Sequence, residues 1–114
     1  TSTVCVSTKG KRVEILNVGF QNRDAGPDFF NAKVRINDVV QVGNVEIHQK
    51  GSDWFRHAHE KDSAYNNVIL SVVGEADMEV YDSRGREIES MIIGYGMSMF
   101  SCREYLLNPV VIDT

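Results

Sequence analysis

All three histidines of the chain fall in the stretch 48–59, among acidic side chains. His48 follows Glu46 by two residues, and His57 and His59 come shortly afterwards. Imidazole and carboxylate groups bind divalent metal ions, and imidazole also transfers protons near neutral pH. This grouping indicates a metal or acid–base site.

Asp28 and Glu46 are the two carboxylates best placed to hold a hard metal ion. Asp28 begins an expected strand over 28–36, and Glu46 lies inside the next expected strand, over 39–48. A tight turn between the two strands gives a hairpin whose open end brings both carboxylates together. Mg²⁺ or Mn²⁺ held there would activate a bound water, which His48 could orient. We therefore assign Asp28, Glu46 and His48 as the candidate catalytic residues.

His57 and His59 extend the candidate ligand set. Two residues apart, they would diverge on a helix but could face one way in an extended or turn segment. Three imidazoles could hold zinc, the less expected ion here, although no HExxH signature accompanies them. The structural alternative is that one histidine packs against Trp54 or caps a helix while another is solvated. The candidate metal ligands are Asp28, Glu46, His48, His57 and His59.

Hydrophobic alternation predicts the strands that position these groups. Segments 12–16, 28–36 and 39–48 alternate between apolar and polar residues, and 17–27 is typical of a loop. The stretch 68–73 is almost wholly apolar, which favours a buried central strand. In the second strand the expected core face carries Phe30, Ala32, Val34 and Ile36.

A short helix is expected to begin near Trp54, with Ser52 or Asp53 as its N-cap. Trp54 should pack this helix against the sheet and donate its indole N–H to a backbone carbonyl. A hairpin within 78–93 and a last helix over 100–107 complete the expected order. The order indicates an α+β domain with a mixed, mainly antiparallel sheet and one or two short helices.

Composition places the chain among soluble globular domains. Its 114 residues are 42% hydrophobic and 25% charged, which fits one domain over 1–114, expected to be a fragment of a longer protein. No apolar run suits a membrane span. Two distant cysteines favour free thiols in a reducing cytoplasm. The net charge of −4 argues against a generally basic nucleic-acid surface, and apolar residues near the end allow a homodimer.

Pro27-Asp28 and Glu46-Ile47-His48 resemble the two motif elements of the PD-(D/E)XK nuclease superfamily, with His48 where that family has Lys. The resemblance implies a restriction-endonuclease-like core. It also implies a metal-dependent phosphodiesterase acting on nucleic acid, with Asp28 and Glu46 on the ion. The superfamily usually adds a Glu from a helix ahead of the first strand, which this chain starts too late to contain.

A second resemblance covers most of the chain. A bacterial family described only as a domain of unknown function is similar in the strings Ala25–Ala32 and Gly43–His48, followed by Ser52-Asp53-Trp54, His57, His59, Asp62, Tyr65 and 68–70. At the position that Ser71 occupies in this chain, the family is expected to have His. This family implies no activity, so a nuclease-like enzyme and a non-catalytic scaffold or binding domain both stay open.

Overall fold

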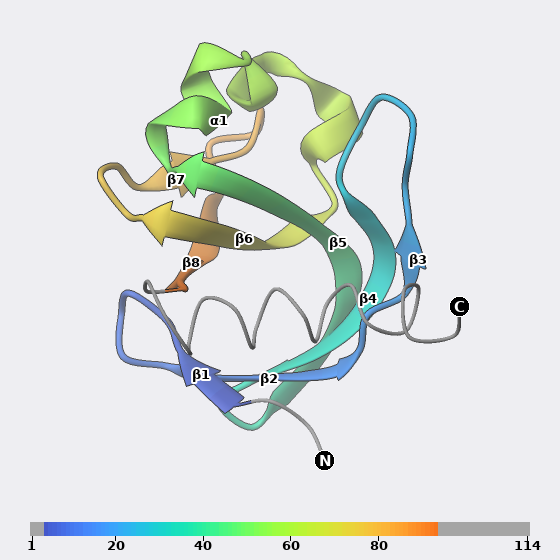
Figure 1. The fold of residues 1–114 in the computed structure, drawn as a ribbon, viewed down its shortest axis with the longest axis vertical. Coiled ribbons are helices and arrows are strands. Elements are labelled where there is room, and N and C mark those ends of the chain that lie inside the picture. Colours follow the sequence, from blue (N-terminus) through green and yellow to red (C-terminus); the bar gives the residue numbers. More distant parts are fainter. Residues whose placement is uncertain (1–3, 94–114) are drawn as a thin grey trace.

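One long, bent strand, β5 (Val39–Lys50), joins two halves of a curled eight-stranded sheet (Figure 1). The computed structural model describes residues 4–93. One half contains β1 (Val4–Val6), β2 (Arg12–Asn17), β3 (Phe20–Gln21) and β4 (Phe29–Ile36). The other contains β6 (Val68–Glu75), β7 (Val80–Tyr81) and β8 (Glu87–Ile92). The strand order is β1-β2-β4-β5-β6-β8-β7, and β3 pairs with β4 beside this path.

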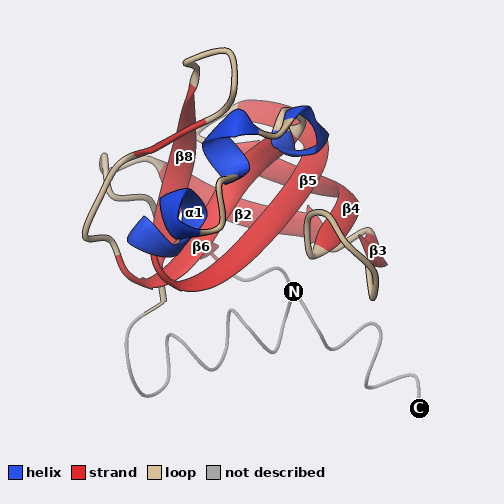
Figure 2. Cartoon of the chain, turned by 90° about the horizontal axis from the view of Figure 1, so that it is seen from above, coloured by secondary structure: helices blue, strands red, loops and turns tan. Residues whose placement is uncertain are grey.

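β5 changes partner along its length, and this change positions the site. Its first part pairs antiparallel with β4, and its second part pairs parallel with β6. A parallel pair needs a crossover connection, and here it carries three short helices, α1 (Ser52–Arg56), η1 (His59–Lys61) and η2 (Ser63–Tyr65). Figure 2 shows them gathered on one side of β5 and β6. The mixed sheet with few short helices agrees with the sequence prediction, but the restriction-endonuclease-like core is not confirmed.

Two apolar clusters lie on opposite faces of β5 and β6. The larger one fills the inside of the curl with side chains that include Ile15, Phe29, Val45 and Leu70. The smaller one, containing Trp54, Tyr65, Val68, Val80 and Ile88, packs the helices against the sheet. The Trp54 indole N–H donates to the Tyr81 carbonyl at 2.8 Å, which confirms the predicted role of this side chain. Because both faces are covered, polar residues of β5 that would otherwise meet solvent are buried.

The predicted core face of β4 is wrong at its first residues. Phe29 is 1% exposed, whereas Phe30 is only half-buried. The pairing of β4 with β5 shifts between Phe29 and Ala32, and Asn31 takes a left-handed φ of 58°. Asn44 accepts a hydrogen bond from the Asn31 backbone N–H at 3.2 Å. This bulge changes the alternation by one residue, which a strict two-residue period cannot anticipate.

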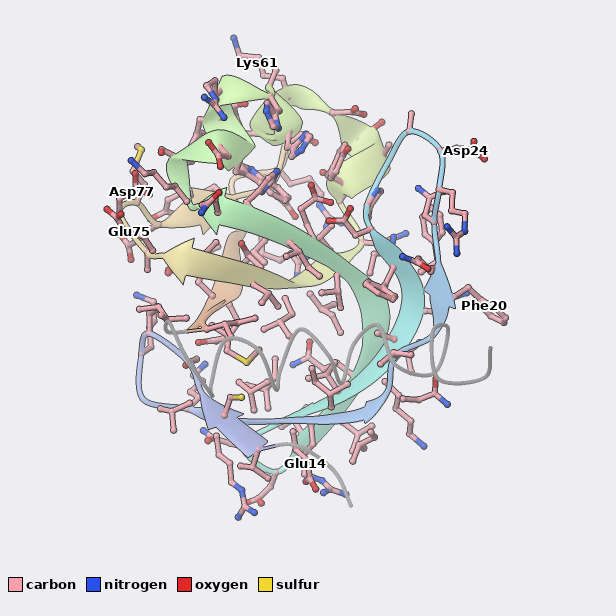
Figure 3. The ribbon with its side chains drawn as sticks, viewed as in Figure 1. Glu14, Phe20, Asp24, Lys61, Glu75 and Asp77 are labelled. Carbon is pink, nitrogen blue, oxygen red and sulfur yellow. The ribbon has the colours of Figure 1, made fainter. Side chains whose placement is uncertain are left out.

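The expected short helix is present as α1, but it begins at Ser52, ahead of the predicted start near Trp54, and its cap differs. Gly51 is the N-cap residue and provides no side-chain hydrogen bond. Asp77, at the outer edge of the molecule in Figure 3, accepts the Ser52 backbone N–H at 2.8 Å. The acceptor therefore comes from the loop after β6 instead of from Ser52 or Asp53.

Two further expectations can be compared with the described residues. Cys5 is disulfide-bonded, so the prediction of a free thiol at this position is wrong. Among residues 4–93, no helix is long and apolar enough to cross a membrane. The helix expected over 100–107 lies outside the described residues, and the homodimer, the cytoplasmic location and the fragment assignment stay predictions.

Candidate metal and acid–base site

Asp28 and Glu46 meet at the open end of the β4–β5 hairpin. The Asp28 backbone N–H donates to Glu46 Oε1 at 3.2 Å. The Ile47 backbone N–H donates to Asp28 Oδ2 at 2.7 Å. The two carboxylates therefore lie close together, as predicted. The Glu46 carboxylate is held by the backbone N–H of Asp28, and the Asp28 carboxylate is held by the backbone N–H of Ile47, the residue after Glu46.

The three histidines converge above β5 although they come from three different segments. His48 lies on β5, His57 follows α1, and His59 opens η1. One ligand atom from each lies within 4.8 Å of the others. Ala58, between His57 and His59, takes a left-handed φ of 60°, which turns the chain sharply. Of the arrangements that the spacing left open, the structure contains the turn that lets both histidines face His48.

Glu46 contacts two of these imidazoles. Glu46 Oε2 lies 3.0 Å from His48 Nε2 and 3.3 Å from His59 Nε2. The three side chains are 7–9% exposed. His59 Nε2 lies at ion-pair distance from Glu46 but makes no hydrogen bond within residues 4–93. His48 Nδ1 is also buried without a hydrogen-bond partner among these residues. Buried polar atoms in folded proteins are nearly always paired, so the two nitrogens call for a partner beyond the described side chains.

Aromatic packing holds His59 in its neutral form. Its ring stacks on Tyr65 with centroids 3.8 Å apart and meets the Trp54 ring edge-on at 5.2 Å. Burial, reinforced by the neighbouring His48 and His57, lowers the pKa of His59 from 6.5 to about 4. Burial also raises the pKa of Tyr65 to about 12. A neutral imidazole is the form that binds metal, so His59 needs no deprotonation at neutral pH.

Asp28 is a carboxyl group of the site whose pKa is raised toward neutrality. Burial raises the pKa of Asp28 from 3.8 to about 6, and the charge of Glu46 raises it further against the opposing hydrogen bond from Ile47. A carboxyl with this pKa exchanges a proton close to physiological pH.

Two residues near the site were not predicted as part of it. Tyr65 was noted in the sequence, but its stacking on His59 depends on the crossover that folds η2 over β5. Ser71 is fully buried and pairs in register with Glu46 across β5 and β6, and its hydroxyl has no hydrogen-bond partner in the described part of the chain. Nothing in an apolar strand pattern indicates that its one hydroxyl lies beside a carboxylate.

The donor set favours a transition metal over magnesium. Imidazole nitrogen suits zinc and its neighbours, while magnesium prefers oxygen ligands. Ligand nitrogens about 2.0–2.1 Å from zinc stand roughly 3.3 Å apart in a tetrahedral site. The ligand atoms here lie up to 4.8 Å apart, so their separation would have to shorten by about 1.5 Å on zinc binding. His57 is exposed and is the candidate ligand best able to move.

The fold and the site define a mostly β domain with a buried histidine–carboxylate cluster able to hold a metal ion. The family described as a protein of unknown function, DUF2851, matches residues 2–107, and the chain belongs to it. No curated protein and no solved structure matches the chain. The resemblance to PD-(D/E)XK nucleases is therefore not confirmed.

Proposed function

We propose that this domain binds a divalent transition metal ion through His48, His57 and His59 and acts as a metal-dependent hydrolase. The observation that carries the proposal is the convergence of three histidines, two of which, His48 and His59, have a buried nitrogen with no hydrogen-bond partner among residues 4–93. A bound ion would give both nitrogens a partner. It would also offset the negative charge of the buried Glu46.

The chain's own groups supply the proton chemistry that hydrolysis requires. When bound, the ion would lower the pKa of a water molecule and polarise the bond to be cleaved. Glu46 stands against two of the three imidazoles and can accept a proton from that water. Asp28 can hold or release a proton near neutral pH because of its raised pKa.

A nuclease-like phosphodiesterase that uses Mg²⁺ or Mn²⁺ is the second candidate. It is favoured by the pairing of Asp28 with Glu46, the two carboxylates that such an ion requires. In that case His48 would serve beside the ion in place of the Lys of the nuclease motif. A non-catalytic domain remains the alternative to both, with the same residues stabilising one another.

Metal analysis and calorimetry separate these candidates. Protein purified without chelator is analysed for bound metal, and the chelated protein is then titrated with zinc, manganese and magnesium. The variants are His57→Ala, Asp28→Asn and, as a matched control, Gln49→Ala, an exposed residue beside His48 on β5. We expect about one zinc per chain, with affinity at least about 100-fold lower in His57→Ala and unchanged in Gln49→Ala.

Each other outcome favours a different function. Manganese binding that is lost in Asp28→Asn and kept in His57→Ala would support the two-carboxylate site instead. Saturable binding of none of the three ions would overturn both metal proposals and leave the scaffold. Hydrolysis of a chromogenic phosphodiester, measured with and without the bound metal, then tests the activity itself.

A further inference from the structure

A polar cleft of about 570 Å³ opens beside the N-terminal end of β6, a short way along β5 from Glu46. It lies where the β4–β5 hairpin, the turn after η2 and the β7–β8 turn meet. Its polar lining comes from Asn31, Asn44, Asn66, Asn67, Arg84 and Arg86. Among the described residues, no acidic side chain lines this cleft. The lining therefore favours an anionic ligand, although the whole chain carries a net charge of −4.

A buried carboxylate fixes the two arginines. Asp82 is 3% exposed and accepts from Arg84 Nη2 at 2.8 Å and from Arg86 Nε at 3.1 Å. The Asn66 carbonyl accepts from Nη2 of both arginines, at 2.5 Å and 3.2 Å. Burial acts to raise the pKa of Asp82, but the hydrogen bonds from the two arginines and their backbone hold it at about 2. Two cations thus share one anion, which leaves one positive charge in excess at the cleft.

Those contacts do not use up the arginine donors. They engage Nη2 of Arg84 and both Nε and Nη2 of Arg86, whereas each guanidinium carries five N–H groups. Nη1 of each arginine is not engaged by these bonds. Both side chains are about half exposed, at 55% and 47%. A guanidinium held in place with spare donors is well suited to bind an oxyanion, because its fork geometry is already set.

The rest of the cleft is shaped by close backbone contact. The Asn44 backbone N–H donates to the Asn67 carbonyl at 2.7 Å. A Cβ added at Gly43 would stand 2.8 Å from that same carbonyl and 2.5 Å from the Ile69 side chain, so only glycine allows this approach. The Asn44 side chain uses its oxygen on Asn31, which leaves its amide N–H₂ as a further donor.

We propose that this cleft binds a phosphate group of the substrate, with Arg84 and Arg86 as the anion ligands and the asparagine amides as additional donors. Asn44 precedes Glu46 by two residues on β5, a separation of about 7 Å along the strand. A phosphate in the cleft would place the adjacent bond of the same molecule toward Glu46 and the histidines. The assignment of this phosphate to the substrate rests on the proposed hydrolase function, whereas anion binding by the cleft does not.

The test measures anion binding in the complete chain with chelator present, so that it is independent of any metal. Inorganic phosphate and pyrophosphate are titrated at constant ionic strength and followed by ¹⁵N-resolved NMR, with acetate as a comparison. The variant is Arg84→Gln, which leaves Arg86 on Asp82. Its matched control is Arg56→Gln, because Arg56 is an exposed arginine that also pairs with a carboxylate, Asp53, and does not line the cleft.

We expect saturable shifts at Asn44, Asn67 and the arginine side chains, with pyrophosphate affinity about tenfold lower in Arg84→Gln and unchanged in Arg56→Gln. If Arg84→Gln does not fold, Asn67→Ala, at an exposed lining position, should weaken binding by a smaller factor. Equal weakening in Arg56→Gln, chemical shift changes spread over the whole protein surface, or equal binding of acetate would overturn the proposal. Phosphate binding without zinc binding would support the anion site and refute the zinc site. Zinc binding without phosphate binding would support the zinc site and refute the anion site.

Discussion

The pH dependence of stability tests the site most directly, because the shifted pKa values of Asp28 and His59 act on stability in opposite directions. The pKa of Asp28 is raised from 3.8 to about 6, so the folded protein holds a proton there that the unfolded chain has released. Its stabilising contribution is complete below pH 3.8 and is lost as the pH rises through 6. The pKa of His59 is lowered from 6.5 to about 4, so its contribution is present above pH 6.5 and is lost as the pH falls through 4.

Between pH 4 and 6 the two contributions therefore tend to cancel. Each has a limiting slope of about 1.4 kcal/mol per pH unit, and the signs are opposite. Replacement of Asp28 by Asn removes one slope and leaves the other. The free energy of unfolding of Asp28→Asn, relative to that of the native protein, should then rise by up to about 3 kcal/mol from pH 4 to 6. Solvent near the half-buried carboxyl makes this an upper value.

Urea unfolding at several pH values between 4 and 7, with chelator present, measures this difference. Trp54 is the only tryptophan and packs in the cluster beside His59, so its fluorescence reports unfolding of the site. Asp24→Asn is the matched control, since Asp24 lies in the same loop and its side chain points away from the protein in Figure 3. If Asp28→Asn shows no pH-dependent change beyond that of the control, the assigned burial of Asp28 is wrong.

Three other perturbations have defined outcomes. Zinc at about 100 times its dissociation constant should add about 2.7 kcal/mol, a rise of roughly 10–20 °C in Tm measured by calorimetry, and His57→Ala should abolish most of it. Ser71→Ala should stabilise the protein in urea by about 1 kcal/mol because it removes an unpaired buried hydroxyl; a loss of stability would mean that the hydroxyl has a partner. Gly19→Ala should cost at least about 2 kcal/mol, because the new Cβ would lie 2.1 Å from the Phe30 carbonyl oxygen. Gly85→Ala, at a similar φ but in open space, should cost only about 1 kcal/mol, and equal losses would refute the steric argument.

Local signals in the sequence predicted the elements well where one rule acts alone. The apolar run at 68–73 became the central strand β6, and the role of Trp54 followed from its amphipathic side chain. Where a distant contact decides, local rules gave the wrong answer. The β4 bulge depends on the side chain of Asn44, and the α1 cap depends on Asp77, so neither could be read from the segment itself.

The site was predictable to the extent that it lies on one hairpin. Asp28 and Glu46 were expected together because hairpin geometry fixes which residues face each other. His57 and His59 required the direction of the chain after β5, which depends on the left-handed Ala58 and on the parallel pairing of β5 with β6. Alanine has no special preference for that conformation, so no residue type marked the turn in advance.

Glu46 explains why these histidines and carboxylates form one unit instead of two neighbouring ones. It is 5% exposed, accepts a backbone N–H from Asp28 through one oxygen, and approaches two imidazoles through the other. A buried negative charge is costly unless a positive charge is near it. Since burial keeps His59 neutral, compensation must come from a proton on another group or from a bound cation. A cation would also give a partner to both nitrogens that have none among the described residues, whereas a proton could satisfy only one of them, and this difference supports the proposal that the histidines are ligands.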